Sequence, residues 1–471
     1  MSFMYNPFPF DDPKPVNRPE LSEKTVSSIV GGGTPNVAKK FAAPIIEKAR
    51  KKNQVVAFDG YTTVDWTVFL NLLARECAAA GIEFESVDAN AECFKSGKEI
   101  DAMIDPMLIW DKKIDPTLLY GKIYKGGYEG MLDEEKTQAF EKKVSALGEG
   151  AGKVVAVFGY GVLIPRFRAL YDTKCFFDIT PKTSILRIRR GEYVNIGKKR
   201  PDIINRVIRR CYYCDFEMAV CSRRELLRNN VPDFWFLSDD PQNIQMLPYE
   251  AFADICAQLV KYPFRAKPCY IEGVWGGSYM KNHRNLPEEM RNAAWVFDFI
   301  PMEVSVVVEA GCEKLDINFC TFVCREGERL MSRDAVEKFH GYFPIRFNYD
   351  DSYHSTGNMS IQCHSGSAYN REHYGEFGRQ DESYYVCVTG HDAKTFIGFR
   401  DDADIPQFFK DIEAADTEHK PCDYMKYVNY EESKPGLQVM LPAGTIHSSG
   451  RNQVILEIGS LTIGSYTYKM Y

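Results

Sequence analysis

Four side chains in the last third of the chain have the types and spacing of metal ligands. Gln362 and His364 are two residues apart in NMSIQCHSGS (358–367), and side chains two apart on a strand point to the same face. Glu382 begins a later strand-like run, and His447 follows a Pro-Ala-Gly turn. Two imidazoles, a carboxylate and an amide oxygen suit Zn²⁺, and Fe²⁺, Mn²⁺ or Co²⁺ are compatible with the same ligand types. The alternative for each residue alone is an ordinary packed or exposed polar side chain.

Neighbouring β-strands must bring these ligands together. After about residue 265, short alternating runs with glycine and aromatic residues indicate an antiparallel sandwich or barrel. The expected strands include EVSVVVEAG, INFCTFVCRE, SYYVCVTG, AKTFIGF, LQVMLPAG, NQVILEIGS and GSYTYKMY. The run YPFRAKPCY (262–270) is the expected linker before them.

The first half of the chain has the pattern of an α/β domain with a parallel sheet. Apolar runs that end in glycine or acidic residues predict strands, and VDWTVFLNLLARECAAAG has helical periodicity. The expected strands are QVVAFDG, IEFESVDA, GKVVAVFGYG, TSILRIRRG and DFWFLSDD. We therefore expect an N-terminal arm and helix over 1–50, an α/β domain over 51–265 and an all-β domain over 266–471.

The strand QVVAFDG leads through a glycine turn into a helix, which is where α/β proteins hold phosphate groups. Gly60, Thr62 and Thr63 lie at the expected place, but no lysine precedes the threonines as a P-loop requires. With the arginine-containing runs that follow, the layout weakly resembles the nucleoside (uridine) kinase branch of P-loop proteins. It predicts a nucleotide at this domain, or a degenerate domain that only binds or only supports the fold. For Arg187, Arg189 and Arg190 the alternatives are phosphate binding and a solvated strand edge or turn.

Composition restricts the class of protein. The net charge of −7 argues against general affinity for nucleic acid or anionic membranes. No signal peptide and no run of 18 apolar residues is present, so we expect a cytoplasmic location and no membrane partner. The 14 cysteines are then expected as reduced thiols. Cys211, Cys214 and Cys221 have the spacing of a partial zinc site, and core thiols are the favoured alternative.

The metal-ligand runs resemble the cupin (jelly-roll) core of type I mannose-6-phosphate isomerases. The resemblance rests on GNMSIQCH, GRQDESYYV and LPAGTIHSS…VILEIG, with support from GVWGGSYM, FPIRFNYDDS and the final GSYTYKMY. It covers roughly residues 266–471. Gln380 stands where the family has a lysine two residues before the metal-binding glutamate, and Lys469 stands in place of an active-site arginine.

The resemblance implies a function as well as a fold. It implies that Gln362, His364, Glu382 and His447 ligate zinc, and that Glu457, Lys469 and Arg379 contribute to catalysis. The implied reaction interconverts mannose 6-phosphate and fructose 6-phosphate by moving a proton between C1 and C2. The alternatives are a non-catalytic sugar-phosphate-binding or regulatory protein, and a nucleoside-kinase-like protein with an accessory cupin.

Overall fold

The N-terminal half is built on a six-stranded, mostly parallel sheet. The computed structural model describes residues 6–115, 118–200, 202–464 and 466–471. The strand order is β3-β4-β2-β5-β6-β7, and only β7 runs antiparallel to its neighbour. Every residue of the inner strand β2 (Gln54–Gly60) is buried, which explains its mainly apolar pattern. The strands are β2 (Gln54–Gly60), β3 (Glu83–Asp88), β4 (Lys153–Phe158), β5 (Thr173–Asp178), β6 (Phe234–Leu237) and β7 (Gln245–Pro248).

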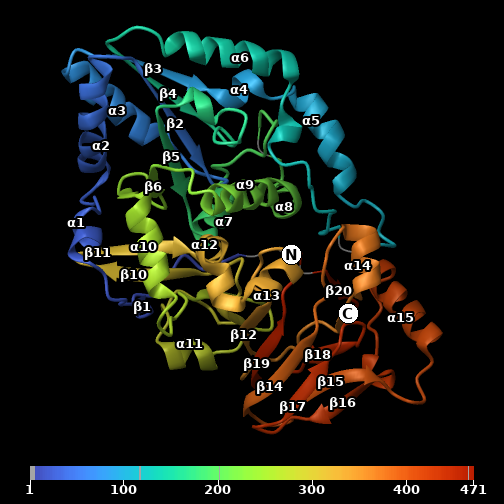
Figure 1. Cartoon of the computed structure of the whole chain (residues 1–471). Helices are drawn as coiled ribbons and strands as arrows, with labels where there is room; N and C mark the ends of the chain where they lie inside the picture. Colours follow the sequence, from blue (N-terminus) through green and yellow to red (C-terminus); the bar gives the residue numbers. More distant parts are fainter. Residues whose placement is uncertain (1–5, 116–117, 201, 465) are drawn as a thin grey trace.

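Helices surround this sheet, as the alternating pattern predicts (Figure 1). They are α1 (Glu23–Ser27), α2 (Thr34–Ala49), α3 (Thr67–Ala79), α4 (Ala89–Cys93), α5 (Gly97–Ile104), α6 (Glu134–Leu147), α7 (Pro181–Arg189), α8 (Ile204–Arg210), α9 (Phe216–Arg228) and α10 (Tyr249–Leu259). A π-helical turn, η4 (Cys211–Asp215), joins α8 to α9. The parallel α/β arrangement of this half is confirmed, whereas its likeness to a P-loop kinase stays a prediction.

The C-terminal half contains two antiparallel sheets. One has the order β17-β14-β19-β12-β9-β8, and the other has the order β16-β15-β18-β13-β20. The first is formed by β8 (Cys269–Ile271), β9 (Trp295–Phe299), β12 (Ile345–Asp351), β14 (Glu382–Thr389), β17 (Gln438–Leu441) and β19 (Gln453–Ser460). The second is formed by β13 (Gln362–His364), β15 (Lys394–Phe399), β16 (Val428–Glu432), β18 (His447–Ser449) and β20 (Thr467–Lys469). Side chains from the two sheets meet at the predicted ligands.

Two predicted strands are wrong, because both segments are helices. TSILRIRRG forms α7, where Pro181 occupies the first turn and the buried Ile185 and Ile188 are three residues apart. INFCTFVCRE ends β11 (Glu313–Asn318) and then forms α12 (Phe319–Met331). The Asn318 side chain caps α12 by accepting from the Cys320 N–H. Short apolar runs fit the period of a helix as well as that of a strand. The residues at the helix starts, Pro181 and Asn318, were therefore the better signal for a helix.

Helices also make the C-terminal half less purely β than predicted. Besides α12 they are α11 (Tyr279–Arg284), α13 (Arg333–Lys338), α14 (Ser367–Tyr374) and α15 (Ile405–Thr417). Figure 1 shows α15 beside the C-terminal sheets and α14 at their upper end, where Tyr374 accepts from the Ile123 N–H of the N-terminal half. The molecule is therefore mixed α/β with several sheets.

The main hydrophobic core extends across residue 265. A small sheet pairs β1 (Val16–Asn17) with β10 (Ser305–Ala310), which also pairs with β11 (Glu313–Asn318). Buried residues of this sheet and of α12 belong to the same cluster as the central parallel sheet. The N-terminal α/β layer and the beginning of the C-terminal half thus stabilise each other.

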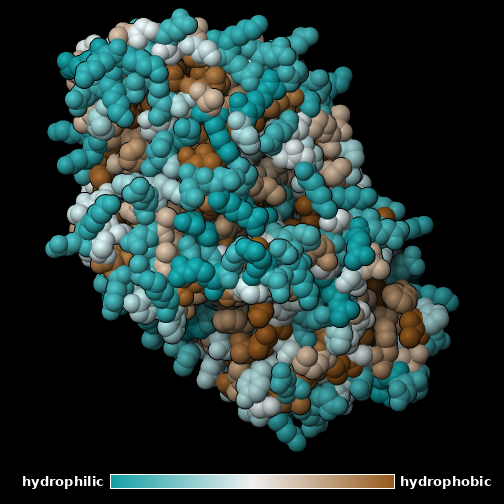
Figure 2. Space-filling view, viewed as in Figure 1, coloured by the Kyte–Doolittle hydropathy of each residue, from teal (hydrophilic) through white to brown (hydrophobic). Residues whose placement is uncertain are grey.

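Hydrophilic side chains dominate the face drawn in Figure 2, and hydrophobic ones are most visible at its lower right, near the C-terminal sheets. Phe409 on α15 and Met440 on β17 are more than half exposed. Within the described residues, no helix is long and apolar enough to cross a membrane.

Glu303 gives the core a pH-dependent component of stability. The Tyr212 hydroxyl donates to Glu303 Oε1 at 2.9 Å, and burial raises the pKa of Glu303 from near 4.5 to about 8. The folded state therefore holds a proton that the unfolded state releases. This contribution is complete below pH 4.5 and falls by about 1.4 kcal/mol per pH unit until it is lost near pH 8. Glu303→Gln should remove this slope, which urea unfolding at pH 5, 7 and 9 would measure. The same dependence of the unfolding free energy on pH in the variant and the wild type would contradict this role of Glu303. Glu289→Gln, at an exposed position, is the control and should keep the wild-type slope.

Candidate metal centre

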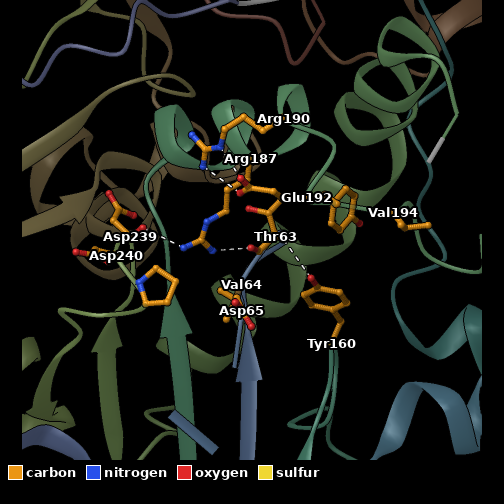
Figure 3. A pocket seen from close by; sticks show the side chains of 12 residues that line it. Thr63, Val64, Asp65, Tyr160, Arg187, Arg190, Glu192, Val194, Asp239 and Asp240 are labelled. Atoms are coloured by element: carbon orange, nitrogen blue, oxygen red, sulfur yellow. Dashed lines mark hydrogen bonds and ion pairs between the residues drawn. The ribbon is translucent and has the colours of Figure 1, made fainter. Parts of the chain in front are cut away.

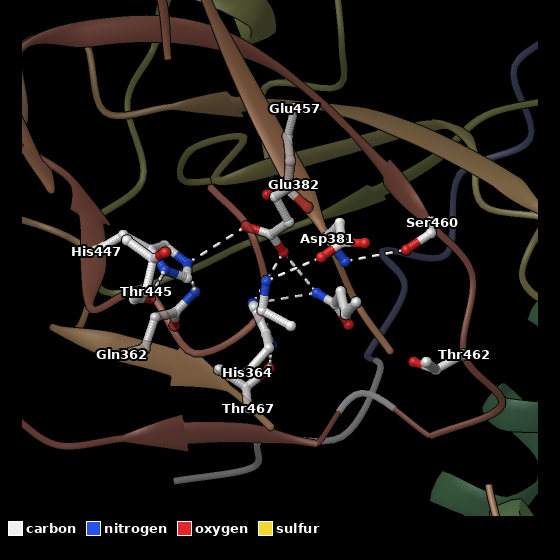
Figure 4. Close-up of polar contacts among 12 residues, drawn as sticks. Gln362, His364, Asp381, Glu382, Thr445, His447, Glu457, Ser460, Thr462 and Thr467 are labelled. Atoms are coloured by element: carbon white, nitrogen blue, oxygen red, sulfur yellow. Dashed lines mark hydrogen bonds and ion pairs between the residues drawn. The ribbon is translucent and has the colours of Figure 1, made fainter. Parts of the chain in front are cut away.

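Three side chains converge between the two antiparallel sheets (Figure 4). Single ligand atoms of His364, Glu382 and His447 all lie within 4.8 Å of one another. His364 Nε2 lies 2.9 Å from Glu382 Oε1, and His447 Nε2 lies 3.3 Å from Glu382 Oε2. All three residues are at most 3% exposed, so the cluster is shielded from bulk water.

Strand register explains why these residues meet. Gln362 and His364 lie at the two ends of β13 on one face, and Gln362 is directly opposite His447 of β18. Glu382 is the first residue of β14 in the other sheet, opposite Gly459 of β19. One sheet thus supplies the imidazoles and the amide, and the facing sheet supplies the carboxylate.

The hydrogen bonding of His447 leaves a place for a cation. His447 Nδ1 lies 2.8 Å from the Thr445 carbonyl oxygen, which can only accept, so Nδ1 carries the proton. In a neutral imidazole, Nε2 then presents a lone pair to Glu382 Oε2, which has no hydrogen-bond donor among the described residues. Two facing lone pairs need a proton or a metal ion between them. The donor set therefore fits a divalent metal of the zinc type.

The fourth predicted ligand lies at the edge of the same cluster. Gln362 Nε2 lies 3.4 Å from His447 Nε2, and the Ser360 hydroxyl donates to Gln362 Oε1 at 3.0 Å. A half-turn of the amide would direct Oε1 toward the centre. The structure thus brings together all four residues of the predicted set.

Burial and charge act in opposite directions on the cluster. Burial lowers the pKa of His364. Burial also acts to lower the pKa of His447, but the Glu382 carboxylate outweighs it and raises that pKa. Burial acts to raise the pKa of Glu382, but the two imidazoles hold it well below its usual range. The carboxylate is therefore ionised and ready to ligate.

Sequence reasoning named Gln380 and Glu457 but missed Arg346 and Asp350 beside Glu382. Arg346 Nη2 donates to Glu382 Oε1 at 2.8 Å and to Glu457 Oε1 at 2.5 Å, so it bridges the two carboxylates. Gln380 Nε2 donates to Glu382 Oε1 at 2.5 Å and lies 3.2 Å from His364 Nε2. Asp350, two residues from Asn348 on β12, is also buried here. The alternating polar residues of FPIRFNYDD (343–351) were the available signal.

The three predicted catalytic residues lie in different environments. Glu457 is within the cluster, where burial and the Glu382 charge raise its pKa to about 7 against the effect of Arg346. Lys469 is directly opposite Gln362 in the β13–β20 pair, and burial lowers its pKa. The Arg379 side chain is 51% exposed and pairs with Asp381 at 2.9 Å. The structure does not bring Arg379 into the cluster.

A cavity away from the candidate metal centre lies at the carboxyl ends of the parallel strands (Figure 3). This cavity of about 580 Å³ is lined by Thr63, Arg187 and Arg190 among others. Arg187 donates to the backbone carbonyls of Thr63, Ser238 and Asp239, and Arg190 pairs with Glu192 at 2.6 Å. The two arginines are therefore engaged within the protein, and phosphate binding here stays a prediction.

The cysteines of η4 behave as core thiols. Cys211 and Cys214 are buried, and burial raises the pKa of each. Across the described ranges, His364, Glu382 and His447 are the one group of three or more His, Cys, Asp or Glu side chains close enough to share a metal ion. The core-thiol alternative thus agrees with the structure for Cys211 and Cys214, whereas Cys221 is exposed.

Comparisons with known proteins give a family of unknown function and a partial structural likeness. A family model described as "Domain of unknown function (DUF8485)" matches residues 38–261. No curated protein matches the chain. A mannose 6-phosphate isomerase from Bacillus subtilis is 18% identical over 44% of this chain and 60% of its own, with a TM-score of 0.33. A protein from Archaeoglobus fulgidus, provisionally described as a mannosephosphate isomerase, is 20% identical over 44% of this chain and 63% of its own, with a TM-score of 0.36.

The match is partial on both sides. A phosphomannose isomerase variant from Salmonella typhimurium is 11% identical over 44% of this chain and 69% of its own, with a TM-score of 0.34. This chain thus spans less than two thirds of the length of the first two matched structures.

Proposed function

We propose that the chain is a divalent-metal-dependent aldose–ketose isomerase that interconverts mannose 6-phosphate and fructose 6-phosphate. The observation that carries the proposal is the convergence of His364, Glu382 and His447, with Glu382 Oε2 lacking a donor among the described residues. Zinc is the proposed ion, with Gln362 as the fourth ligand. The substrate class comes from the sequence resemblance around these four residues.

The remaining roles follow from chemistry that isomerisation requires. A bound ion would supply a Lewis acid for the sugar oxygens next to the transferred proton. Glu457 is the proposed base that moves the proton between C1 and C2, and Arg346 holds its carboxylate in place. Lys469 is the proposed cation for the developing oxyanion or the phosphate. Arg379, which is exposed and paired with Asp381, is proposed to help attract the phosphate group.

A binding or regulatory role without turnover is the second candidate. Two observations favour this role. The cluster of His364, Glu382 and His447 is almost fully buried. The neutral Gln380 lies against His364 and Glu382 at the position where the resembled family has a lysine. An amide cannot supply the positive charge of a lysine to an enediolate. This candidate predicts metal and sugar-phosphate binding without conversion.

A coupled assay separates the two candidates. Purified full chain, loaded with zinc, should convert mannose 6-phosphate to fructose 6-phosphate, and a chelator should stop the conversion. Binding of mannose 6-phosphate by calorimetry without any conversion would select the second candidate. If the chain holds one zinc ion but neither binds nor converts mannose 6-phosphate, both candidate functions are contradicted.

Glu457→Gln should lower kcat by about 100-fold or more while zinc content stays at the wild-type value. General-base catalysis contributes on the order of 10²–10⁴-fold, and the amide keeps the size of the side chain. Zinc content and isomerase rate are measured on the same preparation. An unchanged rate would remove Glu457 from the catalytic residues.

A further inference from the structure

The helix α12 carries two cysteines one turn apart beside a cavity that the metal centre does not use. Cys320 and Cys324 are both buried, and Cys324 lines a cavity of about 310 Å³. Helix α12 packs against α9 and is followed by α13 (Figure 1). Residues of all three helices line the cavity. Cys324 is thus a thiol that a small molecule can approach through this cavity.

Guanidinium groups with unmet hydrogen-bonding capacity surround this thiol. Arg223, on α9, has no exposed side-chain surface, and its Nε and Nη2 have no hydrogen-bond partner among the described residues. The same two atoms of Arg224 are buried and lack partners in the described chain. A Cβ at Gly341, which lines the cavity, would lie 2.8 Å from Arg224 Nε. The Arg224 guanidinium therefore lies directly behind the cavity wall.

Most charged groups around the cavity are paired, and Arg224 is an exception. Asp178 pairs with Arg223 at 2.9 Å, and Glu326 pairs with Arg329 at 2.9 Å. Glu217 accepts from the Tyr342 hydroxyl at 2.8 Å. No acidic side chain of the described residues forms an ion pair with Arg224. Further arginines at the cavity are Arg228 and Arg325, and the remaining acid is Glu328. An anion at the Cys324 sulfur would thus have a nearby countercharge.

The hydrogen bond from the Cys320 thiol, and then the charges of Arg224 and Arg223, lower the pKa of Cys324 against the opposing effect of burial. The same pairing, and then burial, raise the pKa of Cys320. Cys320 is therefore the proton donor of the pair, and Cys324 is the sulfur that lines the cavity. Thiolates, and not thiols, are the reactive form of cysteine.

We propose that Cys324 is a reactive thiolate and a site of oxidation by small hydroperoxides. The thiolate sulfur attacks one oxygen of the peroxide, the S–O bond forms and the O–O bond breaks. The sulfur is oxidised to a sulfenic acid (Cys–SOH), and the peroxide is reduced. With hydrogen peroxide the leaving hydroxide takes a proton from solvent and becomes water. Arg224 stabilises the thiolate before the attack, and Cys320 donates to it.

The test uses the full chain with zinc bound. Alkylation by iodoacetamide, followed residue by residue with mass spectrometry at pH 6.5, should modify Cys324 about tenfold faster than the exposed Cys312. Anionic iodoacetate should favour Cys324 over Cys312 further, because the cavity is positive. Hydrogen peroxide with a sulfenic-acid trap should label Cys324 before Cys312. Slower or equal modification of Cys324 would overturn the proposal.

Variants distinguish the proposed cause from simple access. Cys320→Ala removes the donor to the sulfur and should slow modification of Cys324, whereas Cys320→Ser retains a donor and should be close to wild type. Arg224→Met should shift the pH midpoint of Cys324 alkylation upward. Arg75→Met, at an exposed position of α3 that does not line the cavity, is the control and should leave the midpoint unchanged. An unchanged midpoint in both Arg224→Met and Cys320→Ala would show that these groups do not activate the thiol.

Discussion

Zinc content is expected to fall from about one ion per chain to a small fraction of that in His447→Ala. The variant removes one of two imidazoles and leaves Glu382 Oε2 without the His447 Nε2 that lies 3.3 Å away. Losing even a residue that only orients a ligand costs about 10–100-fold in metal affinity, and losing a ligand itself should cost at least as much. Plasma mass spectrometry and competition with a chelator measure both quantities.

His391→Ala is the matched control, because His391 is exposed and lies outside the cluster. It should retain zinc at the wild-type level. Glu382→Gln, which keeps the shape but removes the charge, should lose zinc as His447→Ala does. Full zinc in both cluster variants would show that the metal binds elsewhere, and the isomerase proposal would lose its basis.

The placement of Gln362 and His364 on one face was predictable because it follows from strand periodicity. Gln362 and His364 must share a face if their run is a strand, and that required no knowledge of the fold. Which strands face them could not come from periodicity. It depends on the register of β13 with β18, and on Glu382 being opposite Gly459. The resemblance to a cupin family supplied those partners.

The environment of the ligands was harder to predict for a physical reason. Arg346 is buried between Glu382 and Glu457, although arginine is usually exposed, and only the two carboxylates make its burial tolerable. Arg379 has the same residue type but is exposed and paired with Asp381. Sequence alone cannot distinguish these two arginines, because the difference lies in the neighbours that the fold provides.

The helix α12 shows the same limit for secondary structure. INFCTFVCRE has the β-favouring residues of a strand, and the strand prediction followed from that composition. Its buried residues include Phe319, Phe322 and Val323, which fit the period of a helix packed against α9. Tertiary packing thus decided between two periods that a short segment satisfies equally well.

Arg223→Met is expected to lower the free energy of unfolding by about 3–5 kcal/mol, because it leaves a buried charge unpaired. Arg223 Nη1 lies 2.9 Å from Asp178 Oδ1, and neither side chain is more than 1% exposed. The Thr321 hydroxyl donates to Asp178 Oδ2 at 2.6 Å. Urea unfolding followed by far-ultraviolet circular dichroism and by tryptophan fluorescence measures the loss. Arg228→Met, on the exposed surface of the same helix, is the control and should change little.

This pair also tests whether the two halves of the chain unfold together. Asp178 ends β5 of the parallel sheet, Arg223 is on α9, and Thr321 is on α12 beyond the predicted boundary at 265. Adding Asp178→Asn to Arg223→Met should recover part of the lost stability, because it removes the unpaired charge and leaves an amide oxygen for Thr321. If the halves form one cooperative unit, both spectroscopic probes will shift by the same amount in each variant. Two separate transitions, with only the first affected by Arg223→Met, would instead show that the parallel sheet unfolds independently of the β-sheets that hold the candidate metal ligands.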